Sequence, residues 1–229
     1  MSSVGTKSQG HLVQGSRRAR ARDSGLRLPS RPALLVLAVG LGVLLAAMLI
    51  VGTRSPDGGL GSFRPLPSLA DRARLSLLDQ DGAPRRLEDY RGKVQLVFFG
   101  FVRCPDVCPT QLFTFAQVLR RLGRDRARVQ VVFVSLDPQR DTPPILKQYV
   151  AAFDPSFVAL TGSPTQVAAL ARSFYVAYRK VPIGRDYTVD HTAATFLIDK
   201  DARQTFVATG EPSPPELRQS LQTLLMKQG

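Results

Sequence analysis

The chain has 229 residues, of which 31 are Lys or Arg and 18 are Asp or Glu, giving a formal net charge of +13 at pH 7. This length accommodates one ordinary domain with attachments. Much of the positive excess lies at the N-terminus, and no basic helix interleaved with aromatic residues follows, which argues against nucleic acid as a partner.

A long apolar segment follows the basic N-terminus. Residues 33–52 contain no charged residue, and this is the length that a helix needs to cross the ~30 Å hydrocarbon core of a bilayer. A buried core helix fits this segment less well, because so uniformly apolar a helix is rare in a small domain. A cleaved signal peptide also fits less well, because its apolar core has only ~7–15 residues. We therefore predict a transmembrane anchor over residues 32–52 and, from the positive-inside rule, a cytoplasmic tail over residues 1–31.

This topology predicts a single-pass protein of the bacterial inner membrane with its C-terminal domain in the periplasm. The Arg- and Ser-rich, acid-poor N-terminus is also typical of a mitochondrial transit peptide. The alternative location is therefore the mitochondrial inner membrane, with the domain facing the intermembrane space. Either compartment allows a pair of thiols to be oxidised.

Residues 53–70 are rich in Gly, Pro and Ser and have no periodicity, so we predict a linker there and a folded domain over residues 71–229. Apolar runs bounded by turn residues predict strands over 75–78, 93–101, 129–136, 195–198 and 204–208. Helical spacing and Ser-Pro or Thr-Pro starts predict helices over 110–122, 142–153, 163–174 and 213–225.

This alternation predicts a small α/β sheet with helices on both faces. Ligand sites in such sheets collect at the edge where the carboxyl ends of parallel strands meet. Two features of the sequence fall at that edge. Cys104 and Cys108 follow the strand predicted over 93–101, and Asp137 follows the strand predicted over 129–136.

Cys104 and Cys108 are the two cysteines of the chain. They allow three interpretations: a redox pair, a metal clamp or a structural disulfide. Their i, i+4 spacing is expected to place both sulfurs on one face of a helix, close enough for a disulfide. A disulfide here closes too short a loop to stabilise the fold much, whereas a helix N-terminus favours a reactive thiolate.

A metal clamp needs a third ligand, and the predicted domain contains one histidine, His191; the other, His11, lies in the basic tail. A single histidine is a weak signal by itself. Thiolate sulfur and imidazole nitrogen together select copper or zinc, and structural zinc generally takes four ligands. Because the domain offers no fourth Cys or His, the count favours copper, as Cu(I) or Cu(II).

Four separate motifs carry a resemblance over roughly residues 71–226. They are LVFFGFVRCPDVCPTQL, VFVSLDPQRDTP, LTGS and YTVDHTAATFLID, and in this order they resemble the Sco/SenC family. The resemblance implies a thioredoxin-like fold tethered by one N-terminal helix, with copper bound by Cys104, Cys108 and His191. It also implies delivery of copper to the dinuclear copper site of cytochrome c oxidase. The chain departs from the usual pattern at Val102-Arg103, where Thr-His is more common.

The partners implied by this resemblance are the copper-site subunit of the oxidase, a copper donor and a thiol reductant. An alternative function is a thiol-disulfide reductase that keeps the partner's cysteines reduced and needs both cysteines but not His191. A peroxidase is a weaker third option. Asp137 matches the first acidic residue of the family's Asp-Pro-x-Arg-Asp motif. We expect one of two roles for it. It either supports the metal site or contacts a partner, or it shapes a turn with Arg140 and Asp141.

Overall fold

The computed structural model describes residues 32, 39–45, 60–67 and 75–226. Its contacts divide the chain into two units, residues 1–53 and 54–229. In the first unit residues 39–45 are helical. The predicted tail and most of the predicted anchor lie outside the described residues, and none of the described helices is long and apolar enough to cross a membrane.

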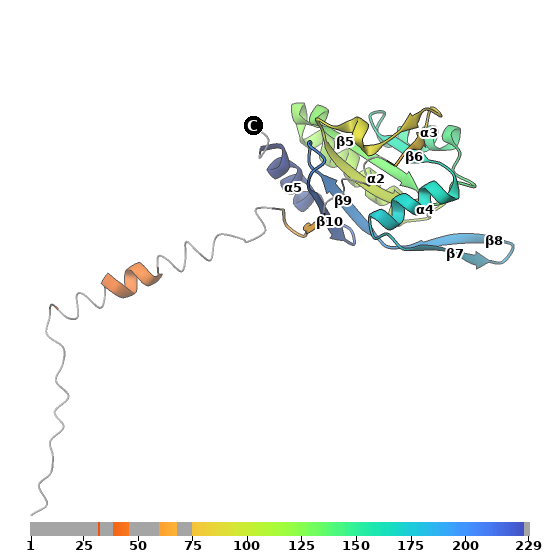
Figure 1. The fold of residues 1–229 in the computed structure, drawn as a ribbon. Coiled ribbons are helices and arrows are strands. Elements are labelled where there is room, and N and C mark those ends of the chain that lie inside the picture. Colours follow the sequence, from red (N-terminus) through yellow and green to blue (C-terminus); the bar gives the residue numbers. More distant parts are fainter. Residues whose placement is uncertain (1–31, 33–38, 46–59, 68–74, 227–229) are drawn as a thin grey trace, which may run out of the picture. The chain divides into compact units, whose positions relative to one another are not determined.

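The second unit is built on an eight-stranded sheet. The strand order is β1 (Arg64–Leu66), β10 (Thr205–Thr209), β9 (Ala194–Ile198), β4 (Val94–Gly100), β5 (Val129–Ser135), β6 (Val158–Thr161), β2 (Leu77–Asp79) and β3 (Pro84–Arg85) (Figure 1). The central strands β4, β5 and β6 are parallel, and the outer pairs are antiparallel. Every residue of β4 and β5 is buried, which explains their continuous apolar sequences.

Helices cover both faces of this sheet, as predicted. They are α2 (Val107–Arg121), α3 (Pro143–Ala151), α4 (Pro164–Ser173) and α5 (Pro214–Met226), with short 3-10 helices at η1 (Leu87–Tyr90) and η2 (Gly123–Arg128). Successive residues of a strand point to opposite faces. Phe98 packs edge-on against Phe115 of α2, whereas Phe99 packs against Phe174 at the end of α4. The helices α2 and α4 therefore lie on opposite sides of β4.

The folded unit begins earlier than residue 71. Residues 64–66, which we assigned to the linker, pair with β10 as the edge strand β1. Leu60 and Phe63 are 4% and 1% exposed, and Ser220 Oγ donates a hydrogen bond to the carbonyl oxygen of Leu60 at 2.9 Å. Burial of these two apolar side chains makes this segment part of the folded unit, although its composition alone indicated a linker.

A second, two-stranded sheet was not predicted. β7 (Tyr178–Ile183) and β8 (Asp186–His191) pair with each other as a separate ribbon, which extends outward below α4 in the view of Figure 1. The turn between them uses Gly184 at a φ of +60°, a left-handed conformation that favours glycine. Most of the ribbon is exposed, so its sequence lacks the apolar runs that reveal a buried strand.

Candidate functional site

The cysteine pair lies where β4 ends and α2 begins. Cys104 is partly exposed in the turn before the helix, and Cys108 is fully buried in its first turn. The spacing predicts that both residues lie on one helical face. The structure differs from this prediction, because Cys104 lies before the start of the helix. The backbone N–H of Cys108 instead donates to Sγ of Cys104 at 3.4 Å. Both cysteines are free, so neither forms a disulfide in this structure.

Gly100, the last residue of β4, allows Cys108 to sit against the strand. A Cβ atom at this position would lie 2.7 Å from Sγ of Cys108 and 2.9 Å from Cε2 of Phe133. Both distances are shorter than a normal van der Waals contact. Glycine is therefore required here because the first turn of α2 packs directly onto the backbone of β4.

The two thiols have opposite electrostatic environments. The pKa of Cys104 is lowered to about 5 by a hydrogen bond from the Cys108 thiol, by the backbone N–H groups of Cys108 and Asp106, and by the nearby charge of His191, against the opposing effect of burial. The pKa of Cys108 is raised by the same thiol–thiolate hydrogen bond and by burial. At neutral pH the site thus presents a Cys104 thiolate beside a protonated Cys108.

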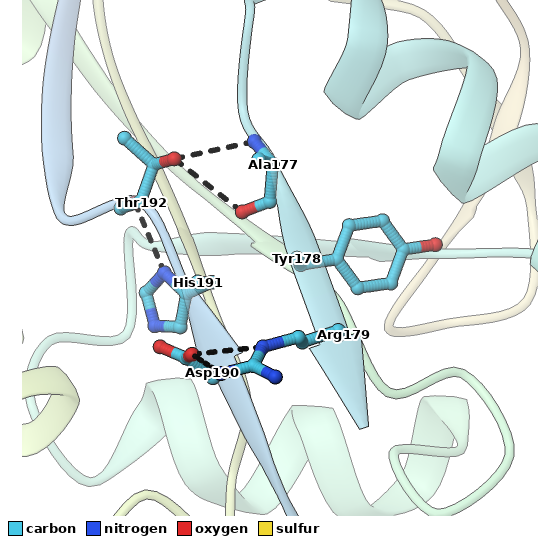
Figure 2. A pocket seen from close by; sticks show the side chains of 6 residues that line it. All are labelled: Ala177, Tyr178, Arg179, Asp190, His191 and Thr192. Atoms are coloured by element: carbon cyan, nitrogen blue, oxygen red, sulfur yellow. Dashed lines mark hydrogen bonds and ion pairs between the residues drawn. The ribbon is translucent and has the colours of Figure 1, made fainter. Parts of the chain in front are cut away.

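His191 is the last residue of β8, opposite Tyr178 in the ribbon. Its ring meets Phe101 of the cysteine loop edge-on, with ring centroids 6.2 Å apart and planes at 88°. Its Nδ1 lies 3.0 Å from the carbonyl oxygen of Thr192 (Figure 2). Because a carbonyl can only accept, Nδ1 carries the proton, which leaves the lone pair of Nε2 available to a metal ion.

The histidine also borders a surface pocket at the base of the ribbon, drawn in Figure 2. The pocket is lined by Ala177, Tyr178, Arg179, Asp190, His191 and Thr192.

The structure brings the two cysteines into contact and places His191 close enough to influence Cys104. Within the described residues it does not assemble three Cys, His, Asp or Glu side chains around one metal position.

Asp137 follows β5 and lies in a turn with Arg140 and Asp141, which is one of the two roles expected from the sequence. Its backbone oxygen accepts hydrogen bonds from the N–H groups of Arg140 and Asp141 at 3.0 and 2.9 Å. Its fully buried carboxylate pairs with the Arg140 guanidinium and accepts the Tyr187 hydroxyl at 2.8 Å. The carboxylate thus faces the protein in this structure and joins the turn to the β7–β8 ribbon.

Asp141, four residues further on, ties the same turn to the cysteine loop. Its Oδ2 accepts the Ser135 hydroxyl at 2.6 Å and the backbone N–H of Val102 at 3.1 Å. Burial raises the pKa of this carboxyl. The sequence contained one signal for this role, since Asp141 is the second acid of the Asp-Pro-x-Arg-Asp motif. Its partners are Ser135 at the end of β5 and Val102 in the cysteine loop.

Sequence reasoning also missed Asp186, at the start of β8. Its carboxylate accepts one hydrogen bond from Arg103 at 3.0 Å and another from Arg140 at 2.9 Å. Arg103 directly precedes Cys104, so the carboxylate joins the ribbon to the cysteine loop. The only local signal was the Gly184-Arg185-Asp186 turn.

The family model that describes SCO1/SenC proteins matches residues 69–226. The chain belongs to this family. A SCO2-like protein of Rickettsia prowazekii is 32% identical over 177 residues, which cover 74% of this chain and 84% of that protein. The mitochondrial SCO2 homolog of Mus musculus is 43% identical over 131 residues, 56% of this chain and 51% of that protein.

Among solved structures, ScoI of Bradyrhizobium japonicum with copper bound is 41% identical, with a TM-score of 0.60, covering 65% of this chain and 95% of that one. This likeness confirms the predicted fold of the SCO1/SenC domain, a mixed α/β thioredoxin-like sheet with helices. The relatives include bacterial and mitochondrial proteins.

Proposed function

We propose that this chain is a membrane-anchored copper metallochaperone that binds copper through Cys104, Cys108 and His191. We further propose that it delivers copper to the dinuclear copper site of cytochrome c oxidase, as the Sco/SenC resemblance implies. The observation that carries the proposal is that Cys104 and Cys108 lie in contact, and that Phe101 of the cysteine loop packs against the His191 ring. A relative 41% identical to this chain has been solved with copper bound, which supports it.

The donor chemistry fits copper. Thiolate and imidazole are ligands that copper prefers over the oxygen ligands of magnesium or calcium. Cys104 is already a thiolate at neutral pH, and the hydrogen bond from Nδ1 to Thr192 leaves Nε2 of His191 free. Cys108 must release its proton to bind a metal ion, so copper affinity falls as the pH falls.

Delivery requires ligands that a partner can reach. Cys104 is partly exposed, and His191 lies on a ribbon that shares no strand pairing with the main sheet. Copper then passes by ligand exchange to thiolates of the oxidase copper-site subunit. A copper donor loads the site and a thiol reductant keeps both cysteines reduced. In this proposal residues 32–52 anchor the domain to the bacterial inner membrane on its periplasmic side; the alternative is the mitochondrial inner membrane, facing the intermembrane space.

Copper stoichiometry and absorption spectra of the reduced full-length protein test the ligand set. We expect stoichiometric copper in the wild type, and loss of copper or a changed spectrum in C104S, C108S and H191A. The matched control is H11A, which removes the other histidine and is expected to leave binding unchanged. Absence of stoichiometric copper from the wild type, or an H191A protein that binds copper like the wild type, would contradict the proposal.

A second function, thiol-disulfide reduction, is favoured by the asymmetry of the two thiols. The Cys104 thiolate attacks a partner disulfide and forms a mixed disulfide, releasing one partner thiolate. Cys108 then gives up its proton and attacks Cys104, which releases the second partner thiol and leaves a Cys104–Cys108 disulfide. Two electrons thus pass to the partner, and an external thiol reductant restores the pair.

The two functions differ in their need for His191. Reduction of a model peptide disulfide by H191A is expected to match the wild type, whereas copper retention by the same variant is expected to be lost. If H191A loses both, the histidine serves the thiols as well as the metal ion. If it loses neither, the reductase becomes the better description of the chain.

A further inference from the structure

The β7–β8 ribbon is positioned by side chains rather than by a strand ladder. Its backbone hydrogen bonds join β7 to β8, and neither strand pairs with the eight-stranded sheet. Tyr178 and His191 pair at its base, and Ile183 and Asp186 pair at its turn. The placement of His191 relative to the cysteines therefore depends on what holds the two ends of this ribbon.

At the base, His191 meets Phe101 of the cysteine loop. At the turn end, Asp186 holds two arginines from two different loops. Nη1 of Arg103, in the cysteine loop, donates to Oδ2 at 3.0 Å, and Nη1 of Arg140, in the loop between β5 and α3, donates to Oδ1 at 2.9 Å. Each carboxylate oxygen thus accepts one arginine, so a single side chain joins three segments.

Arg140 is the buried part of this junction, with a side chain that is 15% exposed. Besides Asp137 and Asp186, it donates to the carbonyl oxygen of Tyr187 at 2.9 Å, and its guanidinium lies 3.7 Å from the centre of the Tyr187 ring. Arg103 is 61% exposed and Asp186 59% exposed. The Asp186–Arg103 contact to the cysteine loop is therefore exposed to solvent, whereas the Arg140 side chain on the other side of the junction is mostly buried.

We propose that Asp186 is a positioning residue that holds the β7–β8 ribbon against the cysteine loop through Arg103 and Arg140, and so keeps His191 against Phe101 of that loop. Without the carboxylate, the ribbon loses its ion pairs with Arg103 and Arg140. It keeps the contacts of Tyr187 and Lys180 with the loop between β5 and α3. The ribbon then opens more often, and His191 leaves the cysteine loop more often. The part of this inference that concerns copper rests on the proposed function, whereas the part that concerns the ribbon does not.

The test compares Asp186→Asn with Asp81→Asn in the full-length protein. Asn keeps the size of the side chain and removes its charge. Asp81 is a matched control, because it is 55% exposed and pairs with Lys147 at 2.7 Å across a similarly large separation in the sequence, but on another part of the domain. The two readouts are hydrogen exchange of the ribbon amides in copper-free protein, and the rate at which Cu(I) passes to a bicinchoninate chelator.

We expect both rates to rise roughly threefold to tenfold in D186N, since exposed ion pairs are individually weak and two are lost together. Both rates should stay at the wild-type value in D81N. Because Arg103 acts through Asp186, R103Q should accelerate both processes by itself and add less in the D186N background.

Each outcome decides one part of the inference. Unchanged ribbon exchange in D186N overturns the positioning role, whatever copper does. Faster exchange with unchanged copper release overturns the link to His191. If the wild type binds no copper, the proposed function fails, and with it the copper part of this inference; the exchange experiment still decides whether Asp186 holds the ribbon.

Discussion

The central strands and the β7–β8 ribbon hold the candidate ligands in opposite ways. β4 and β5 are buried along their whole length and hydrogen-bond to neighbours on both sides, whereas Val189 is the one buried residue of β8. The cysteines follow β4, and His191 ends β8. Two candidate ligands therefore follow a fully buried strand and the third ends a largely exposed ribbon, an arrangement that suits the proposed binding and release of copper.

The largest predicted difference is in the reactivity of the two cysteine thiols. Cys108 belongs to the packed core and has a raised pKa, whereas Cys104 is partly exposed with a pKa of about 5. At pH 7, Cys104 should therefore be alkylated by iodoacetamide at least ~100-fold faster than Cys108. Because the lowered pKa keeps Cys104 ionised, its rate should stay near its maximum down to about pH 6 and fall as the pH drops through 5.

Mass spectrometry of the alkylated peptides measures both rates in one sample. In denaturant the two thiols should react alike, which provides the control. A midpoint for Cys104 near the ordinary value of 9.0 would show that the loop does not stabilise its thiolate.

The core and the ribbon should also differ sharply in their contribution to stability. Phe196 of β9 is 1% exposed and packs on Phe174 and Phe99 at ring-centroid distances of 5.0 and 5.8 Å. F196A should lower the free energy of unfolding by about 3–5 kcal/mol, because it leaves a cavity in this cluster. Ile183, in the ribbon, is 60% exposed, so I183A should change it by no more than about 0.5 kcal/mol. Urea unfolding of both variants tests the contrast, and similar losses would show that the ribbon is part of the core.

Gly100 tests how tightly the cysteine helix packs on β4. G100A places a methyl group within 2.7 Å of Cys108 Sγ and should cost about 1–3 kcal/mol of unfolding free energy. G162A is the matched control. The nearest atom there is Oε1 at the end of the exposed Gln166 side chain at 3.1 Å, which needs to shift by only a few tenths of an ångström, so the cost should stay below about 1 kcal/mol. Equal costs would mean that the strand and helix can separate without penalty.

The smallest predicted effect concerns the buried end of the ribbon junction. Y187F removes the hydroxyl that donates to Asp137, but leaves that carboxylate paired with Arg140. It should lower the free energy of unfolding by about 1 kcal/mol and speed hydrogen exchange in β8. An unchanged exchange pattern would show that packing of the ring on Arg140, rather than its hydroxyl, holds the ribbon.

The predictions from sequence succeeded where the pattern is local. The strands over 93–101 and 129–136 were recognised because both are continuous apolar runs, and the helix starting near Ser163 because Ser163 and Pro164 form a local start signal that the structure confirms as a capping box. The start of α2 was placed three residues late, at Thr110 instead of Val107, and the helix includes Pro109 in its first turn. Proline is tolerated in the first turn of a helix, where its missing N–H has no partner.

Elements held by distant partners escaped prediction. β1 is a three-residue edge strand containing Pro65, and it exists because β10 pairs with it and Phe63 is buried. The β7–β8 ribbon contains Pro182 and many polar residues, so neither strand shows a buried face. The same holds for the bonds of Asp141 and Asp186 to the cysteine loop, which lies far away in the sequence.

The sequence by itself determined the candidate donor residues, the family and the central alternation of strand and helix, because these depend on residue identity and on short-range periodicity. Only the tertiary structure decided that Cys104 lies outside the helix, that the two thiols have opposite pKa shifts, and that His191 sits on a separate ribbon. These properties arise from burial and from hydrogen bonds between loops that the chain brings together only when it folds. The ribbon is the clearest case, since each of its anchoring contacts to the cysteine and β5–α3 loops joins residues at least 40 positions apart.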